Sequence, residues 1–212
     1  MKKLLIFSCL LCIGIGISGC TNPKESEICP ILSGNFACWT NISWSIDRSD
    51  FTGCITTVLH ALKTQDFTTL AQFVWPQWLR FSPYEYVNAT TDVVLTTEEI
   101  TNGLTISRSY LWWTYDGSGE PIDLWIGQFF EKFVRDADYA QAPEILYNQS
   151  IQRGNTTNNI AQVYKTKQWV EFYFSWFDPQ YSGIDRKSLT LVFENQNGQW
   201  YLIGIVHWSR TI

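Results

Sequence analysis

The sequence predicts an α+β domain, with helices gathered in its first half and a mainly antiparallel sheet in its second half. Three observations support this prediction. Apolar residues recur at helical spacing from residue 55 onward, they alternate with a period of two from residue 159 to the end, and turn signals separate the two regions. The chain has 212 residues, which suits one domain of the common size of about 100 to 200 residues.

Two helices are expected at the start of the domain, which begins near Thr52. The first helix carries apolar residues at helical spacing, namely Ile55, Val58, Leu59 and Leu62. Asp66 is expected to cap a second helix over residues 67–74, because a carboxylate at this position accepts backbone N–H groups of the first turn. Pro76 ends that helix.

The middle of the chain mixes extended and helical segments. Residues 78–86 are expected to be extended, and Thr96 with Glu99 forms a capping box for a short helix. An aromatic strand is expected over 107–115, followed by a turn at 116–119. A third helix, ending near residue 136, is predicted from a helical stripe made of Ile122, Ile126, Phe129, Phe130 and Phe133.

A meander of strands should close the domain. The expected strands lie near 160–164, 168–177, 188–194 and 199–208. Asn197 and Gly198 predict a tight hairpin between the last two, because both residues tolerate positive φ angles. The sheet is therefore predicted to be mainly antiparallel.

Both faces of these strands are apolar. Val170 and Phe172 alternate with Trp169 and Tyr173, whereas a sheet with one wet face would show polar residues at every second position. We therefore expect helices on one face, and either the lead-in segment 36–50 or a partner on the other. A homodimer remains open.

The first residues have the layout of an export signal. Two lysines precede an apolar run over residues 4–17, which is shorter than the roughly 18 residues of a membrane-spanning helix. Ile17-Ser18-Gly19-Cys20 resembles the lipobox of bacterial lipoproteins, which implies cleavage before Cys20 and lipid attachment to its thiol. The expected organisation is a signal peptide over 1–19, a lipidated tether and irregular lead-in over 20–51, and the domain over 52–212.

The expected location is the bacterial cell envelope. Two or more acyl chains give stable attachment to a membrane, whereas one chain gives only marginal binding. Loss of residues 1–19 leaves 13 basic and 20 acidic residues, a formal charge of −7, so the body should not lie on anionic lipid. Thr21 stands where an Asp would resemble an inner-membrane retention signal, which favours the outer membrane in a bacterium with two membranes.

Three cysteines remain in the exported body, namely Cys29, Cys38 and Cys54. An oxidising compartment allows one disulfide and one free thiol. We favour Cys29 with Cys38 or Cys38 with Cys54, because the N-terminal segment has little regular structure. A catalytic cysteine with a histidine partner also stays open.

Several partner classes are disfavoured. A net charge of −5 without a basic stripe argues against nucleic acid as a partner. The only histidines are His60 and His207, and no CxxC or HxxxH spacing accompanies them in the exported body that remains after residues 1–19, so no metal site is expected. Phosphate loops, the GxSxG elbow and HExxH are also missing from the sequence, and no cofactor is expected.

The order of the expected elements resembles the NTF2-like superfamily, which includes ketosteroid isomerase, scytalone dehydratase and SnoaL-type cyclases. Segments 78–84, 115–122 and 200–207 are also similar to uncharacterised bacterial lipoproteins associated with that fold. The resemblance covers roughly residues 52–212. It implies a cone in which helices pack on a curved, mainly antiparallel sheet and a pocket lies between the helices and the concave sheet face.

Chemistry of the ketosteroid-isomerase kind needs a carboxylate base and an acidic donor in an apolar pocket. The candidate pocket residues are Tyr84, Tyr115, Asp116, Asp138 and His207. No pair of them matches a catalytic motif of the family, so catalytic residues stay unassigned.

Three functions remain open at this stage. The leading hypothesis is a lipid-anchored protein that binds a partner or a small apolar or sugar-like ligand without chemistry, since its 11 tryptophans could line a stacking cleft or fill a core. The second is an exported isomerase, dehydratase or hydrolase. The third is a structural envelope component that acts through the outer sheet face.

Overall fold

The computed structural model describes residues 47–210 except 153–156, 177–178 and 182–184. These residues belong to one compact unit, Trp44–Ile212. The expected signal peptide, Cys20, the tether and two of the three remaining cysteines, Cys29 and Cys38, lie outside the described residues. Within the described residues, no helix has both the length and the apolar character needed to cross a bilayer.

The described helices, with their bounds, are α1 (Phe51–Thr64), α2 (Phe67–Phe73), α3 (Thr97–Thr101), α4 (Ile126–Phe129), the π-helical turn η2 (Phe130–Val134), α5 (Ile160–Val163) and the 3-10 turns η3 (Tyr139–Gln141) and η4 (Pro179–Tyr181). The described strands are β1 (Leu79–Ser82), β2 (Val93–Leu95), β3 (Tyr110–Thr114), β4 (Pro121–Leu124), β5 (Glu144–Tyr147), β6 (Gln168–Phe174), β7 (Lys187–Gln196) and β8 (Gln199–Ser209).

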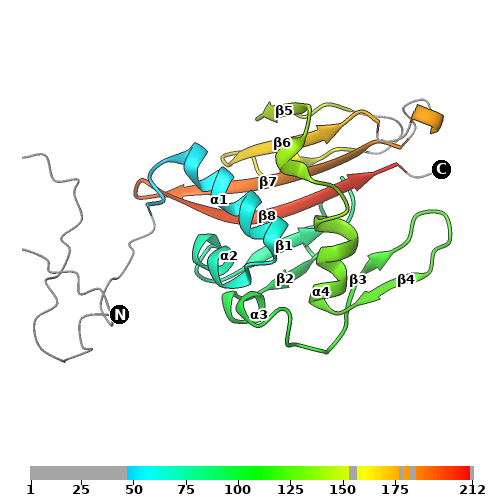
Figure 1. Cartoon of the computed structure of the whole chain (residues 1–212), viewed down its shortest axis with the longest axis horizontal. Helices are drawn as coiled ribbons and strands as arrows, with labels where there is room; N and C mark the ends of the chain where they lie inside the picture. The colour runs from blue at the N-terminus through cyan, green and yellow to red at the C-terminus, as the bar shows by residue number, and fades with distance from the viewer. Residues whose placement is uncertain (1–46, 153–156, 177–178, 182–184, 211–212) are drawn as a thin grey trace, which may run out of the picture. The chain divides into compact units, whose positions relative to one another are not determined.

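Six of these strands form one sheet in the order β2-β1-β8-β7-β6-β5, and β3 and β4 form a separate antiparallel ribbon. Every described pair in the large sheet is antiparallel except β1 with β8, which is parallel. Helices α1 and α2 and the α4–η2 segment pack on one face of this sheet (Figure 1). The predicted α+β class and the mainly antiparallel sheet are therefore confirmed.

The local start and stop signals act as expected. Asp50 and Asp66 accept backbone N–H groups at the starts of α1 and α2. Thr96 and Glu99 form the predicted capping box. The turn between β7 and β8 has positive φ at Asn197 (53°) and Gly198 (78°), as a two-residue hairpin turn requires.

Two predicted elements are wrong. Ile122 does not belong to the third helix but to β4, where it pairs with Trp113 across the β3–β4 hairpin. Residues 160–164 do not form a strand, because residues 160–163 form the short helix α5. Strand β5 and the parallel β1–β8 pair were not predicted from the sequence.

Both faces of the large sheet are buried, as the sequence indicates. A small second core covers the face away from α1 and α2, made of Val87, Ile160, Tyr164, Trp169, Val192, Ile203 and Val206. The chain's own loop after β1, together with α5, therefore covers this part of the second face. The sequence indicated the lead-in or a partner there. Asn159 joins the loop to α5, because its amide accepts the N–H of Val87 at 2.8 Å and donates to the carbonyl of Val87 at 2.9 Å.

Candidate functional site

Aromatic side chains fill the space between the helices and the sheet. Trp112 is fully buried and stacks on Phe129 with ring centroids 3.7 Å apart, and Phe81 meets both rings edge to face. These contacts leave little room for a ligand at the centre of this core. Two pockets, each of about 200 Å³, lie at its margin.

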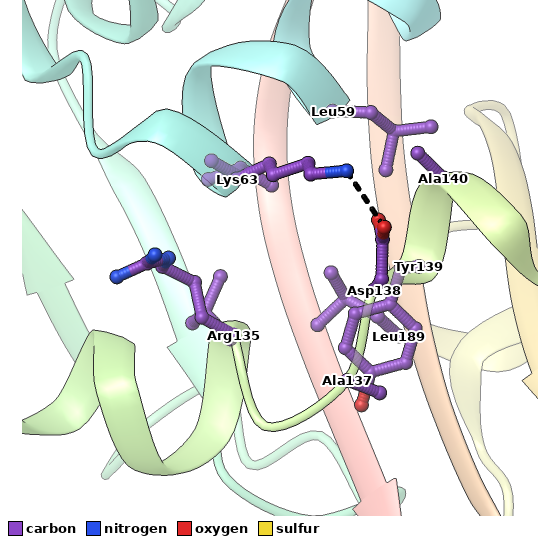
Figure 2. A pocket seen from close by; sticks show the side chains of 10 residues that line it. Leu59, Lys63, Arg135, Ala137, Asp138, Tyr139, Ala140 and Leu189 are labelled. Atoms are coloured by element: carbon purple, nitrogen blue, oxygen red, sulfur yellow. Dashed lines mark hydrogen bonds and ion pairs between the residues drawn. The ribbon is translucent and has the colours of Figure 1, made fainter.

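The first of these, the helix-side pocket, lies between α1, η3 and β7 (Figure 2). Its lining includes Leu59, Lys63, Arg135, Asp138, Tyr139 and Leu189. Figure 2 shows Lys63 pointing to Asp138, and Lys63 Nζ lies 2.6 Å from Asp138 Oδ2. Arg135 pairs with Glu131. The charges at this pocket therefore pair with side chains of the protein itself.

A cluster centred on Asp136 lies beside the helix-side pocket. The Asp136 carboxylate accepts the Tyr139 hydroxyl at 2.6 Å, lies 2.8 Å from Lys187 Nζ and lies 3.2 Å from His207 Nε2. Burial alone would raise the pKa of Asp136, but hydrogen bonds from His207, Lys187 and Tyr139 and the charge of His207 hold it well below the usual range. The Asp136 side chain is thus an ionised carboxylate at neutral pH.

His207 is wholly engaged in this cluster. Its Nδ1 lies 3.1 Å from the Pro83 carbonyl and its Nε2 faces Asp136, and both partners are acceptors. A doubly protonated ring, which donates through both nitrogens, satisfies both contacts. The ring is only 2% exposed, so neither nitrogen can reach a substrate proton, as a general base must.

Two tyrosines near this cluster are held by contacts within the protein. Burial, with the charge of Asp136 and the hydrogen bond to it, raises the pKa of Tyr139 far above its usual value. Tyr115 accepts a hydrogen bond from Lys132 at 2.7 Å, and its ring stacks against Phe133. We therefore interpret the cluster as structural.

The second pocket, the loop pocket, lies where the loop after β1, the end of the β3–β4 hairpin and the segment before α5 meet. Its lining includes Tyr84, Glu85, Tyr86, Asp92, Trp113 and Asp116. Two of its aromatic side chains reach solvent, with Tyr86 55% and Trp113 40% exposed. The backbone N–H of Asp116 donates to the Tyr84 hydroxyl at 3.1 Å, which joins the hairpin turn to the loop. Burial raises the pKa of this tyrosine.

Glu85 and Asp92 are both buried carboxylates of the loop pocket, and Glu85 accepts from Asn158 Nδ2 at 2.9 Å. Only 8% of Asp92 is exposed. Its Oδ2 accepts the Ser82 hydroxyl at 2.5 Å and the backbone N–H of Asn88 at 2.9 Å. Among the described residues, no hydrogen-bond donor reaches Oδ1. Burial raises the pKa of Asp92 despite these hydrogen bonds and the charge of Arg80.

The five residues predicted for a pocket thus separate into three places. Tyr84 and Asp116 line the loop pocket, Asp138 lines the helix-side pocket, and His207 and Tyr115 line neither. Sequence reasoning named Trp113 only among the tryptophans that could line a stacking cleft, and it did not select Asp92 or Glu85. The pair Trp112-Trp113 carried a usable signal, because adjacent residues of a strand face opposite ways and one ring must then leave the core.

Neither a metal site nor a reactive thiol is found in the part of the chain that the structure describes. That part contains no group of three or more His, Cys, Asp or Glu side chains that could hold a metal ion. Cys54 is a free, fully buried cysteine on α1. Burial, with smaller contributions from Asp50 and Asp47, raises the pKa of its thiol to about 11, so it is a poor nucleophile at neutral pH.

Comparison with known proteins gives no family by sequence. No protein-family model matches the chain. No curated protein matches it either.

The chain is similar to several solved structures at low sequence identity. A DUF4783 family protein from Bacteroides ovatus is 9% identical with a TM-score of 0.34, and the match covers 74% of this chain and 94% of that one. An NTF2-like protein from Cytophaga hutchinsonii is 11% identical with a TM-score of 0.33, covering 74% and 93%. An uncharacterised protein with a cystatin-like fold from Caulobacter vibrioides is 10% identical with a TM-score of 0.33, covering 76% and 87%. The structures to which this chain is similar thus include the NTF2-like group that its sequence resembles.

Proposed function

We propose that the protein is a lipid-anchored protein of the bacterial cell envelope whose α+β domain binds a small ligand in the loop pocket without chemistry. One observation carries the binding role. The pocket combines partly exposed aromatic rings with Asp92, a carboxylate that is more than nine-tenths buried and has one oxygen without a donor among the described residues. A ligand that donates to this oxygen would form a charge-assisted hydrogen bond with the carboxylate.

We favour binding over catalysis because two groups suited to proton transfer, Asp136 and His207, are occupied, which leaves Asp92 as the candidate acid or base of the loop pocket. Asp136 and His207 satisfy each other and their neighbours. Catalysis by acid and base needs a group within hydrogen-bond reach of the substrate. The loop pocket offers carboxylates and tyrosines but no histidine among its described lining residues.

The anchoring role rests on the sequence alone. Ile17-Ser18-Gly19-Cys20 follows a short apolar run and precedes a polar segment with two prolines and two glutamates. Such a segment would hold the domain away from the membrane surface. In a bacterium with two membranes, we propose the outer membrane as the location, since Thr21 follows the cysteine.

Anchoring is tested by labelling the full chain with palmitate in a bacterial host and separating the membrane fraction. We expect label and membrane association for the natural chain and for Cys12→Ala, which changes a cysteine within the apolar run. Both should be lost in Cys20→Ala. Label that persists in Cys20→Ala would contradict the proposal.

Ligand binding is tested by native mass spectrometry of the full chain, purified gently in detergent. We expect a small molecule that is retained by the natural chain and by Trp176→Leu, which alters an exposed tryptophan that does not line the loop pocket. Trp113→Leu should lose it. Turnover of that molecule by the protein would overturn the non-catalytic role, and equal retention by both variants would exclude the loop pocket.

A further inference from the structure

We infer that the ligand of the loop pocket is an organic cation, a small molecule that carries an ammonium or methylated ammonium group. This inference rests on the proposed binding role of the pocket and specifies its ligand class. It departs from the apolar or sugar-like ligand that the sequence suggests.

The polar groups of the pocket are mainly hydrogen-bond acceptors. Glu85, Asp92 and Asp116 line it, and none of its described lining residues is Lys, Arg or His. An ionised carboxylate only accepts hydrogen bonds. The ligand must therefore supply donors, and a positive charge would match the carboxylates better than neutral hydroxyls.

Asp92 sets the strongest demand for positive charge. The charge of Arg80 lowers the pKa of Asp92, but Arg80 donates to the carbonyls of Ala89 at 3.0 Å and Asn88 at 3.4 Å and lies over the Trp78 ring. The described hydrogen bonds to Asp92 come from Ser82 and Asn88 and reach only Oδ2. A ligand cation at Oδ1 would pair with the carboxylate oxygen that accepts neither of these hydrogen bonds.

The aromatic rings complete the cation site. Tyr84, Tyr86 and Trp113 line the same pocket as the carboxylates. Aromatic faces attract ammonium groups, and quaternary ammonium ligands are commonly held by several such rings. A purely apolar ligand would also contact the rings but would cover Asp92 without giving it a donor, which costs free energy.

Size and long-range charge agree with a small cation. The pocket has a volume of about 200 Å³, which suits a small molecule. The net charge of −5 also favours the approach of cations from solution.

The test measures the binding of charged and neutral probes to the full chain in detergent by calorimetry. Choline and butylammonium are the charged probes, 3,3-dimethylbutan-1-ol is the neutral isostere of choline, and glucose represents a sugar. We expect saturable binding of at least one of the two cations. If choline binds, its neutral isostere should bind at least tenfold more weakly.

Variants locate the binding. We expect Asp92→Asn to weaken cation binding at least tenfold and Asp116→Asn to weaken it less, because Asp116 is exposed. Glu98→Gln removes one charge from an exposed position on α3 outside the pocket and should leave binding unchanged. Thermal unfolding of each variant shows whether a loss of binding reflects a loss of fold.

The outcomes separate this inference from the proposed function. The cation inference is overturned if choline and its isostere bind equally well. It is also overturned if only glucose binds and Trp113→Leu abolishes that binding. In both cases the pocket remains a binding site. Cation binding that Asp92→Asn leaves intact also overturns the cation inference. If none of the probes binds, the cation inference fails, and the native mass spectrometry above decides the binding role independently.

Discussion

Asp136 and Asp92 are both largely buried carboxylates, yet their surroundings shift the pKa of each in opposite directions. Three side chains, Tyr139, Lys187 and His207, donate to Asp136, and the pKa of this group falls well below its usual range. Two hydrogen bonds reach Asp92, both at the same oxygen, and its pKa is raised by burial.

The difference shows that burial alone does not identify a binding residue. A buried carboxylate whose oxygens are all satisfied rigidifies the fold and has nothing left to offer a ligand. A buried carboxylate with an open oxygen retains an unmet requirement for a donor. Asp136 should therefore act as a structural carboxylate and Asp92 as a binding one.

The largest effect is expected for Asp136→Asn. The substitution leaves His207 and Lys187 without their carboxylate, and breaking a buried ion pair in this way costs about 3 kcal/mol of the free energy of unfolding. Denaturant unfolding measures the loss. The matched control is Asp138→Asn, whose ion pair with Lys63 is about half exposed, and which should cost less than about 0.5 kcal/mol. Equal losses in the two variants would show that the Asp136 cluster has no special role.

The pH dependence should differ in sign between the two carboxylates. Because the folded pKa of Asp136 lies below the unfolded value near 3.8, its stabilising contribution is complete above that value and is lost as the pH falls through the folded pKa. Because the pKa of Asp92 is raised, its charged form costs stability at neutral pH, and this cost disappears as the pH falls through its folded pKa toward 3.8.

Unfolding measured from pH 7 down to about pH 3 checks both signs. The difference between the natural chain and Asp136→Asn should shrink toward the acid end. Any advantage of Asp92→Asn at pH 7 should also vanish there. Relative to the natural chain, Asp136→Asn should gain stability and Asp92→Asn should lose it as the pH falls, so a shift of both variants in the same direction would contradict the comparison.

A smaller effect is expected for Tyr139→Phe, which removes one of the three donors to Asp136. The loss of a buried hydrogen bond to a charged group costs about 1.5 kcal/mol. The control is Tyr84→Phe, which removes from a half-buried tyrosine only the acceptor for the N–H of the exposed residue Asp116 and should cost less. Denaturant midpoints of the two variants give the comparison, and a larger loss in Tyr84→Phe would contradict it.

Local signals explain what the sequence could predict of the fold. Asp66, the Thr96–Glu99 capping box and the Asn197-Gly198 turn each act within a few residues, so they are readable without the rest of the chain. Ile122 shows the limit. It continues the helical spacing toward Ile126, but its pairing with Trp113 across the hairpin decides its structure, and such pairing is not visible in a local window.

The candidate site was harder to predict for the same reason. Tyr84 and Asp116 lie 32 residues apart and meet through one hydrogen bond. Asp92 lies between the mainly polar residues 88–91 and the apolar strand β2, and nothing in the sequence indicates that the fold buries it against Ser82. Contacts of this kind arise only once β1 is placed in the sheet.

The smallest change in stability is expected for Asp92→Asn, and this makes it the sharpest test of the comparison. The side-chain oxygen of asparagine can still accept from Ser82 and from the Asn88 N–H, and the cost of burying a charge disappears. We expect the free energy of unfolding to change by less than about 1 kcal/mol, while cation binding falls at least tenfold. A stability loss as large as that of Asp136→Asn would show that Asp92 is also a structural carboxylate, and the loop pocket would then lose its main argument as a binding site.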